Sequence, residues 1–201
     1  MLSLADILVL ADDDGADINS LTVQGESAPE LTLGSIDLKG SLLTDCPLTS
    51  CRLEGTGFQD VTFDHCDLSG TVFLEGGLKK VRFRDCRMMG TIFSGCVLSQ
   101  VFFEACSARY LTLSGCTLKG CAFREGCFAG GFFSGLKCQK TTVSRCDFTR
   151  CDFSGTALSG FDFSGCTIEG AVWSLDKLKG MTVNLQQALE LSRLLGLNIV
   201  S

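Results

Sequence analysis

The chain has 201 residues, of which 45% are apolar and 20% charged, and its formal net charge at pH 7 is −6. A chain of this length can bury a continuous core as one domain without disulfides or a structural metal. Polar residues interrupt every apolar run, which excludes a transmembrane helix.

The first fifteen residues differ in composition from the rest of the chain. Residues 1–14 read MLSLADILVLADDD, an apolar stretch that lacks a basic residue at its start and turns acidic. A secretory signal has a basic region before its apolar part, so we expect a cytoplasmic protein. We assign residues 1–15 to an N-terminal cap or flexible segment.

From Leu33 to Val183, every fifth residue is apolar. Most of these positions hold Leu or Phe, and the smallest occupants are Ala108 and Cys138. Neither an α-helix nor a plain β-strand has a period of five residues, so the pattern predicts an internal-repeat array.

Each five-residue unit also has a second, smaller position two residues before its apolar centre. Cys46, Val61 and Thr71 are examples. Residues two apart share one face of an extended segment, so both positions should point inward. Sixteen of the 23 glycines occupy the last position of a unit, where a tight turn benefits from positive φ. We therefore predict a short strand and a corner in each unit.

The residues at the smaller positions also show a second, longer period of 20 residues. One set at this spacing is almost entirely cysteine and is interrupted by Gly126. Its cysteines are Cys46, Cys66, Cys86, Cys106, Cys146 and Cys166. Twenty residues at a period of five give four sides per turn, so we predict an all-β square β-solenoid in which like residues stack coil upon coil.

Three runs of sequence connect this pattern with a known family. CDFTRCDFSG at 146–155, CDLSGTVF at 66–73 and ADINS at 16–20 resemble the pentapeptide-repeat family. Its consensus is a small residue, Asp or Asn, Leu or Phe, and two variable residues. The resemblance implies a right-handed quadrilateral β-helix, and we assign residues 16–184 to this solenoid.

The 13 cysteines do not predict a metal or redox site. Eleven of them lie at the smaller inward position, where a buried thiol packs as a small apolar group. Neighbours such as Cys46 and Cys51 point from different sides, which excludes the close cluster that zinc needs. Cys127 falls at an outward position, and we expect it to be the most reactive thiol.

Catalytic motifs are missing from the sequence. His65 is the single histidine and lies at a corner beside Asp64, which favours an isolated surface histidine over a general base. The sequence contains no phosphate-binding loop, paired-carboxylate motif or nucleophile elbow. We therefore expect a protein that is not an enzyme and that needs no cofactor or metal.

The C-terminal segment leaves the five-residue pattern. NLQQALELSRLLG at 184–196 predicts a helix with Asn184 as N-cap and Gly196 past its end. The face expected to cover the last coil contains Leu185, Ala188, Leu189, Ser192 and Leu195.

Residues 185–201 are therefore assigned to a capping helix and strand. Leu191 and Leu194 widen the apolar stripe beyond the needs of a cap, which favours a homodimer interface over a simple cap. The predicted interface residues are Leu191, Leu194, Leu195, Leu197 and Ile199.

This tail also resembles one branch of the family, the quinolone-resistance and DNA-gyrase-protecting members. The matching residues are Gln186, Gln187, Ala188, Leu189, Leu194, Leu195, Gly196, Leu197 and Ile199. The resemblance implies a C-terminal dimer that binds a type II topoisomerase (DNA gyrase) by imitating B-form DNA. Such a protein protects gyrase from quinolones or toxins, and it contacts neither nucleic acid nor membrane directly.

The charge pattern bears on DNA mimicry in two directions. Residues 1–40 carry eight acids and one lysine. Five acids line one corner of the predicted rod and are the candidate partner-binding residues: Asp45, Asp64, Asp85, Glu104 and Glu125.

Basic residues weaken the case for DNA mimicry. Arg84, Arg124 and Arg145 share the acidic corner, and the neighbouring corner is basic. Its lysines are Lys39, Lys79, Lys80, Lys119, Lys140 and Lys179. The alternative to topoisomerase binding is therefore a general scaffold rod with an unrelated partner.

Overall fold

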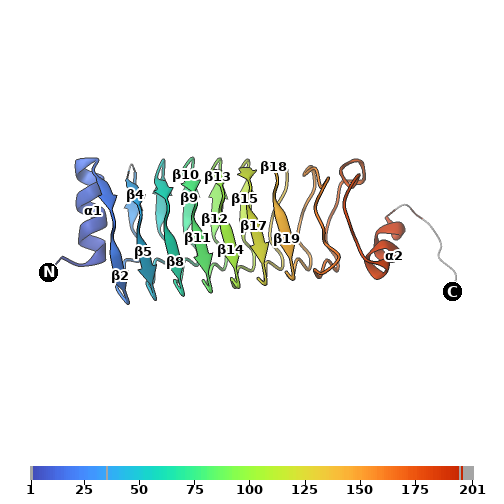
Figure 1. Cartoon of the computed structure of the whole chain (residues 1–201), viewed down its shortest axis with the longest axis horizontal. Coiled ribbons are helices and arrows are strands. Elements are labelled where there is room, and N and C mark those ends of the chain that lie inside the picture. Colours follow the sequence, from blue (N-terminus) through green and yellow to red (C-terminus); the bar gives the residue numbers. More distant parts are fainter. Residues whose placement is uncertain (1, 35, 195, 197–201) are drawn as a thin grey trace.

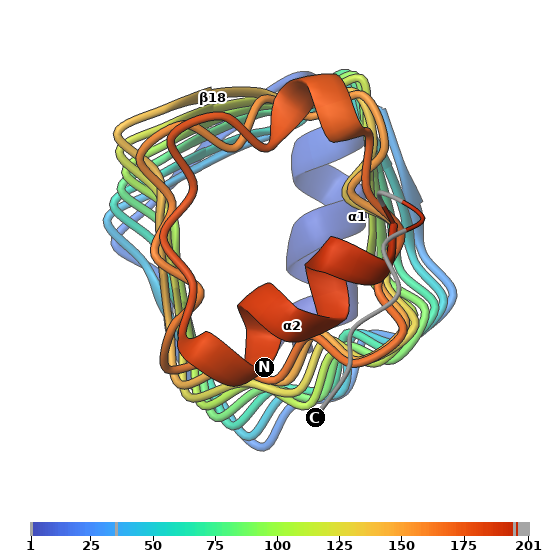
Figure 2. The same cartoon turned by 90° about the vertical axis from the view of Figure 1, so that its right-hand side faces the viewer.

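The structure is a computed structural model, and it describes residues 2–34, 36–194 and 196. The chain winds into a rod of stacked coils with a helix at each end (Figure 1). Viewed along its axis, the rod has four sides (Figure 2). We number the faces in chain order: the first face begins with β1 (Asp17–Asn19), the second with β2 (Thr22–Gln24) and the fourth with β3 (Thr32–Leu33). The third face consists of residues 46–50 and their equivalents at intervals of 20 residues.

The first, second and fourth faces are parallel β-sheets up to Gln139, Ser144 and Ser114, respectively. In the later coils, single bridges such as Phe132–Asp152 on the fourth face and Asp162–Thr182 on the second face take the place of strands. Each strand pairs with the strand one coil away, so that Leu78 lies beside Phe58 and Leu98. The first face continues through β4 (Asp37–Lys39), β7 (Gly57–Gln59), β10 (Gly77–Lys79), β13 (Val97–Ser99), β16 (Thr117–Lys119) and β18 (Lys137–Gln139). The second continues through β5 (Leu42–Thr44), β8 (Thr62–Asp64), β11 (Arg82–Arg84), β14 (Phe102–Glu104), β17 (Ala122–Arg124) and β19 (Thr142–Ser144). The fourth continues through β6 (Arg52–Glu54), β9 (Val72–Leu74), β12 (Ile92–Ser94) and β15 (Thr112–Ser114).

The third face departs from the predicted strand in every unit. Its neighbouring coils are joined by single bridges such as Pro47–Asp67 and Asp67–Arg87. The backbone then turns, and the N–H of Thr71 donates to the carbonyl of Leu68 at 3.0 Å. The Asp67 carboxylate accepts from the N–H of Ser69 at 3.0 Å. A side chain that satisfies a nearby backbone N–H stabilises a turn in place of a strand.

The core is a column of apolar side chains along the rod axis. The rings of Phe63, Phe83, Phe103 and Phe123 stack with centroids 5.1, 5.1 and 4.9 Å apart. Beyond Phe123 the rings that stack from one coil to the next belong to the third and fourth faces, as in Phe128–Phe148 and Phe133–Phe153.

Gly126 lies at this change of faces. A Cβ at Gly126 would approach a Phe128 ring carbon to 2.7 Å. The ring therefore excludes the thiol that the cysteine column would place there, which explains the interruption noticed in the sequence.

The smaller inward residues donate hydrogen bonds to the preceding coil. The Cys66 thiol donates to the carbonyl of Leu43 at 3.3 Å, and the Thr91 hydroxyl donates to the carbonyl of Leu68 at 2.8 Å. The same contact joins Cys106 to Phe83 at 3.4 Å. Cys and Thr thus share a function at this position, because both combine small volume with a donor.

The corners have the predicted left-handed backbone. Every residue at the last position of a unit from Gly40 to Gly160 has a φ between 50° and 84°. Lys80 and Asp85 adopt this conformation without being glycine, with φ of 54° and 52°. The corner geometry therefore follows from the repeat rather than from the residue type alone.

Helices cover both ends of the solenoid. Helix α1 (Leu4–Asp14) begins with a capping box of Ser3 and Asp6, and it buries Leu4, Leu8 and Ala11. Helix α2 (Leu185–Arg193) begins at the predicted N-cap, Asn184, whose side chain accepts from the N–H of Gln187. A short 3₁₀ helix, η1 (Leu175–Lys177), precedes it. Within the described part of the chain, neither α-helix has the length and apolarity needed to cross a membrane.

The donor at the smaller position gives a test of the core. The hydroxyl of Thr56 is buried and has no hydrogen-bond partner among the described residues. The hydroxyl of Thr71 donates to Leu48 O at 2.5 Å and accepts from Cys51 N at 3.2 Å. We expect Thr71→Val to lower the free energy of unfolding by about 1–3 kcal/mol, because it leaves buried backbone groups unpaired. Thr56→Val should leave it unchanged or raise it slightly. Urea titration measures both variants, and equal losses would contradict the assigned hydrogen bond.

Candidate protein-interaction surface

The predicted acidic stripe lies on the edge between the second and third faces, in two adjacent columns. Asp64 ends β8 and Glu104 ends β14, so these two acids lie in one column. Asp45, Asp85 and Glu125 occupy the left-handed corner position that follows, with φ of 53°, 52° and 56°. The structure therefore brings all five predicted residues to one edge of the rod.

Arginines interleave with these acids along the edge. Arg84 binds both carboxylate oxygens of Asp64 from the next coil. Glu104 pairs with Arg82 at 3.1 Å and with Arg124 at 3.3 Å. The sequence places Arg84 and Arg124 at the same corner as the acids, and the structure resolves them into ion pairs between neighbouring coils.

The remaining acids of the stripe differ in their partners. Arg145 pairs with Glu125 from the next coil. The Gln24 amide donates to Asp45 at 3.3 Å. Neither Asp45 nor Asp85 takes part in an ion pair of the described residues. These two acids are thus the part of the stripe with negative charge left for a partner.

Asp64 is the most protected acid of the edge, with a side chain that is 12% exposed. The hydrogen bonds from Arg84 lower the pKa of Asp64 below its ordinary value, in spite of the opposing effect of burial. His65 adds a contact of 2.9 Å to the same carboxylate. Asp64 therefore stays ionised and remains joined to its basic neighbours.

Phe102, at the start of β14 on the second face, is not among the residues predicted from the sequence. Its ring lies between two guanidinium groups, with Arg82 at 5.4 Å and Arg124 at 5.8 Å from the ring centroid. A cation over an aromatic face is attracted by the ring quadrupole. The sequence could have predicted the contact with Arg82, because residues 20 apart, such as Arg82 and Phe102, lie beside each other on neighbouring coils.

One group of described residues has the ligand types for a cation. Atoms of Asp64, His65 and Asp85 lie within 4.8 Å of one another. The Asp64 oxygens already accept hydrogen bonds from Arg84 and His65, so a metal would have to displace a guanidinium. The group is better suited to an ion-pair network than to metal binding.

The cysteines are free thiols, and all except Cys127 and Cys138 are buried. Burial raises the pKa of Cys66 and of Cys106 to about 12. Such thiols are poor nucleophiles at neutral pH, since the thiolate is the reactive form. Cys127 is half-buried at its outward position, and its thiol lies 3.6 Å from Asp147 Oδ2.

The C-terminal end exposes apolar side chains, but the helix presents a different face from the one predicted. Gln187 is the buried residue of α2, and its amide donates to the carbonyls of Phe163 and Cys166 at 2.9 and 2.7 Å. Leu185 is 79% exposed and Leu189 40% exposed. The assignment of these two residues to the cap was therefore wrong, because a polar amide satisfies the end of the last coil.

The predicted interface residues of this end divide into two groups. Leu191 and Leu194 line a small hollow between α2 and the last coils, beside Ile168 and Trp173. Leu194 is 47% exposed. Leu195, Leu197 and Ile199 lie outside the described residues, as does the predicted terminal strand.

Sequence comparison identifies the family. A model described as a pentapeptide repeat region matches residues 56–133, and one described as pentapeptide repeats in eight copies matches residues 33–70 and 132–171. The two matches together span residues 33–171 without a gap. The chain belongs to the pentapeptide-repeat family, and its fold is the quadrilateral β-helix predicted from the period.

The solved structures to which the chain is similar are distant from it in sequence. QnrB1, a plasmid-mediated fluoroquinolone resistance protein, is 19% identical, with 91% of this chain and 99% of that chain covered and a TM-score of 0.34. HetL, which is involved in heterocyst differentiation regulation in the cyanobacterium Nostoc, is 13% identical, with coverages of 90% and 95% and a TM-score of 0.28. Rfr23 from the cyanobacterium Cyanothece is 10% identical, with coverages of 89% and 98% and a TM-score of 0.29. No curated protein sequence matches the chain.

The pairing of Asp64 with Arg84 makes stability depend on pH. The pKa of Asp64 is lower in the folded protein than its ordinary value of 3.8, so its contribution is present above about pH 4 and is lost as the pH falls. We expect Arg84→Gln to lower the urea midpoint at pH 7 and to have a smaller effect below pH 4. Arg87→Gln is the control, since Arg87 forms no ion pair among the described residues. A loss for Arg84→Gln that is independent of pH would contradict the pairing.

Proposed function

We propose that this protein is a non-enzymatic binding rod that recognises a protein partner through its outer surface. The observation that carries the proposal is the separation of inward apolar side chains from outward charged ones. The interior of the coils holds apolar residues with Cys and Thr, whereas charged side chains form columns on the outside. Columns that repeat at every coil, about 4.8 Å apart, present a long regular surface for recognition.

The partner that we propose is a type II topoisomerase, DNA gyrase, bound by DNA mimicry. The support is the resemblance of the tail to gyrase-protecting family members, together with the acidic edge of Asp45, Asp64, Asp85, Glu104 and Glu125. A consequence would be protection of gyrase from quinolones or toxins. The arginines of the same edge favour the second candidate, a scaffold rod with an unrelated partner, because they neutralise Asp64, Glu104 and Glu125.

We further propose that two rods associate through their C-terminal ends in the cytoplasm. Leu185, Leu189 and Leu194 expose apolar surface at this end of the rod, and Val172 and Leu175 of the last coil are about half exposed. Exposed apolar side chains at one end of a rod are suited to an isologous contact between two copies. The 13 free cysteines agree with a reducing compartment.

A supercoiling assay with purified gyrase tests the proposed partner. We expect micromolar wild-type protein to alter supercoiling and to restore activity in the presence of a quinolone. The double variant Asp45→Lys/Asp85→Lys should weaken this effect, since these acids are not held in ion pairs. The matched variant Glu75→Lys/Glu169→Lys changes exposed acids elsewhere and should retain it.

Sedimentation of the same proteins separates binding from assembly. Both double variants should remain dimers, while Leu185→Glu/Leu189→Glu should yield folded monomers. A wild type that leaves gyrase unaffected at micromolar concentration would contradict the topoisomerase proposal and favour the unrelated partner. A monomeric wild type would contradict the interface.

A further inference from the structure

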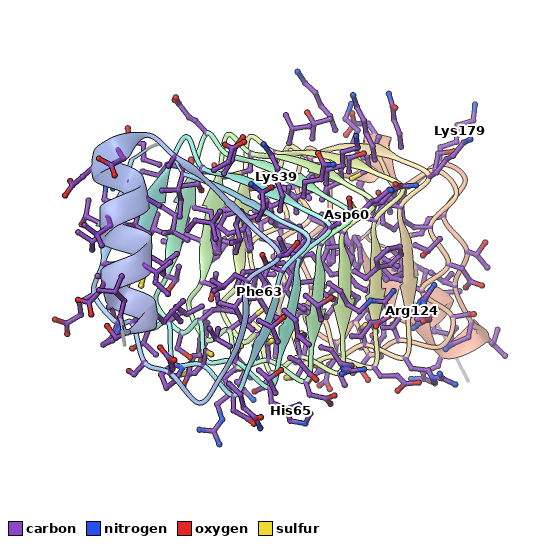
Figure 3. All side chains as sticks on the ribbon, turned by 60° about the vertical axis from the view of Figure 1, so that its left-hand side comes forward. Lys39, Asp60, Phe63, His65, Arg124 and Lys179 are labelled. Carbon is purple, nitrogen blue, oxygen red and sulfur yellow. The ribbon has the colours of Figure 1, made fainter. Side chains whose placement is uncertain are left out.

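All eight lysines of the sequence lie on one side of the rod. They occur at positions of the first face and at the corner that follows it, and all nine arginines lie elsewhere. The lysines are Lys39, Lys79, Lys80, Lys119, Lys137, Lys140, Lys177 and Lys179. Figure 3 shows Lys39 and Lys179 along one side of the rod, away from His65 and Arg124. We call this side the lysine face.

Most of the charge on the lysine face is not neutralised by the protein itself. Lys39, Lys80 and Lys177 pair with acids of the same side. Five lysines take part in no ion pair of the described residues: Lys79, Lys119, Lys137, Lys140 and Lys179. The arginine edge shows the opposite pattern, since Arg84, Arg124 and Arg145 are all paired. The lysine face therefore carries a positive charge that an external group can neutralise.

Three of the eight lysines form a row at a fixed spacing. Lys39, Lys79 and Lys119 occupy equivalent positions in every second strand of the first face, with Gln59 and Ser99 between them. Two coils separate neighbouring lysines, which corresponds to about 9.6 Å along the rod.

A hollow lies beside this row. Gly57 and Gly77 hold the outward position of β7 and β10, and a hollow of about 280 Å³ lies beside them, bordered by Asp37, Lys39, Lys79 and Val97. The Asp37 carboxylate lies over Gly57, so the open part of the hollow is above Gly77. A Cβ added at Gly77 would meet no atom within 4 Å. A chain lying along the rod can thus approach the sheet closely beside the lysines.

We propose that the lysine face binds an extended acidic segment of a partner protein, with carboxylates at every third residue. This proposal rests on the proposed function as a protein-binding rod and names a second surface for it. A polyproline II segment has three residues per turn and repeats every ~9.3 Å, close to the ~9.6 Å between lysines. Disordered acidic segments populate this conformation readily.

The chemistry of the face favours a carboxylate-bearing protein over nucleic acid. Arginine is the residue of choice for nucleic-acid recognition because its planar fork matches phosphate, and the lysine face contains none. Asp37 and Asp60 lie within the same side, and they repel a continuous polyanion while leaving room for separated carboxylates. Nucleic acids and anionic lipids are the alternative ligands, and the experiment below distinguishes them from an acidic protein segment.

Fluorescence anisotropy with the full-length protein tests the proposal. The probe is a labelled synthetic peptide in which Glu occupies every third position between Pro and Ser, and a second peptide has the same composition with its glutamates clustered. We expect the spaced peptide to bind more tightly at low salt and to be released at high salt, because these charges are exposed. Lys79→Gln/Lys119→Gln/Lys140→Gln should weaken binding by about tenfold or more. The matched variant Arg87→Gln/Arg109→Gln/Arg150→Gln removes three exposed cations from other faces and should bind as the wild type does.

A further variant separates docking in the hollow from diffuse attraction. Gly77→Leu fills the hollow without backbone strain or loss of charge, and we expect it to weaken binding of the spaced peptide. Circular dichroism confirms that each variant is folded. Equal binding by the lysine and arginine variants, equal binding of the two peptides, or an unchanged Gly77→Leu variant would overturn the proposal.

Two other results distinguish the partner class and the proposed function. Tighter lysine-dependent binding of duplex DNA, or of vesicles containing phosphatidylserine, would overturn the assignment to an acidic protein. In another outcome, the spaced peptide fails to bind the wild-type protein while the lysine variant still acts on gyrase as the wild type does. That result would overturn this inference and leave the topoisomerase proposal intact. Peptide binding without any effect on gyrase would support this inference and contradict the topoisomerase proposal.

Discussion

The structure depends on the stacking of residue i upon residue i+20. Parallel hydrogen bonding between coils holds equivalent residues in line, as in Phe63, Phe83 and Phe103, and it places their rings about one coil apart. The same register carries Cys66 and Thr91 to the carbonyls that they bond. One periodic constraint therefore sets the core, the inward hydrogen bonds and the columns of charge on the surface.

The period predicted the solenoid and its corners because both repeat in every unit. Features that vary among units were harder to predict. The third face forms turns in every unit, and in two of them Asp67 and Asp147 bond a backbone N–H two residues on. Pro47 holds the same position without such a bond, so no single residue type in the sequence signals the turn. The burial of Gln187 was missed because an amide that bonds the free carbonyls of the last coil has no hydrophobic signature. The acidic stripe was located correctly, but its neutralisation by Arg84 and Arg145 depends on side-chain geometry between coils.

The surface charges divide the rod into two regions with different patterns of ion pairing. At the edge between the second and third faces, arginines pair with Asp64, Glu104 and Glu125. On the second face beside this edge, the Phe102 ring lies between two guanidinium groups. On the lysine face, cations such as Lys79 and Lys119 have no such partners among the described residues. A rigid core makes this division permanent, because the coil register fixes where every outward side chain lies. In the proposed function, recognition therefore depends on which of these columns a partner can match.

The most direct test of this account compares two insertions at the same place. Duplication of residues 81–100 adds one complete coil and preserves every column, whereas insertion of one residue after Ser99 moves each later inward side chain out of line. Equilibrium unfolding followed by circular dichroism should show a cooperative, native-like transition for the added coil. The one-residue insertion should lose the structure of the C-terminal half. A one-residue variant that unfolds like the wild type would contradict the 20-residue register.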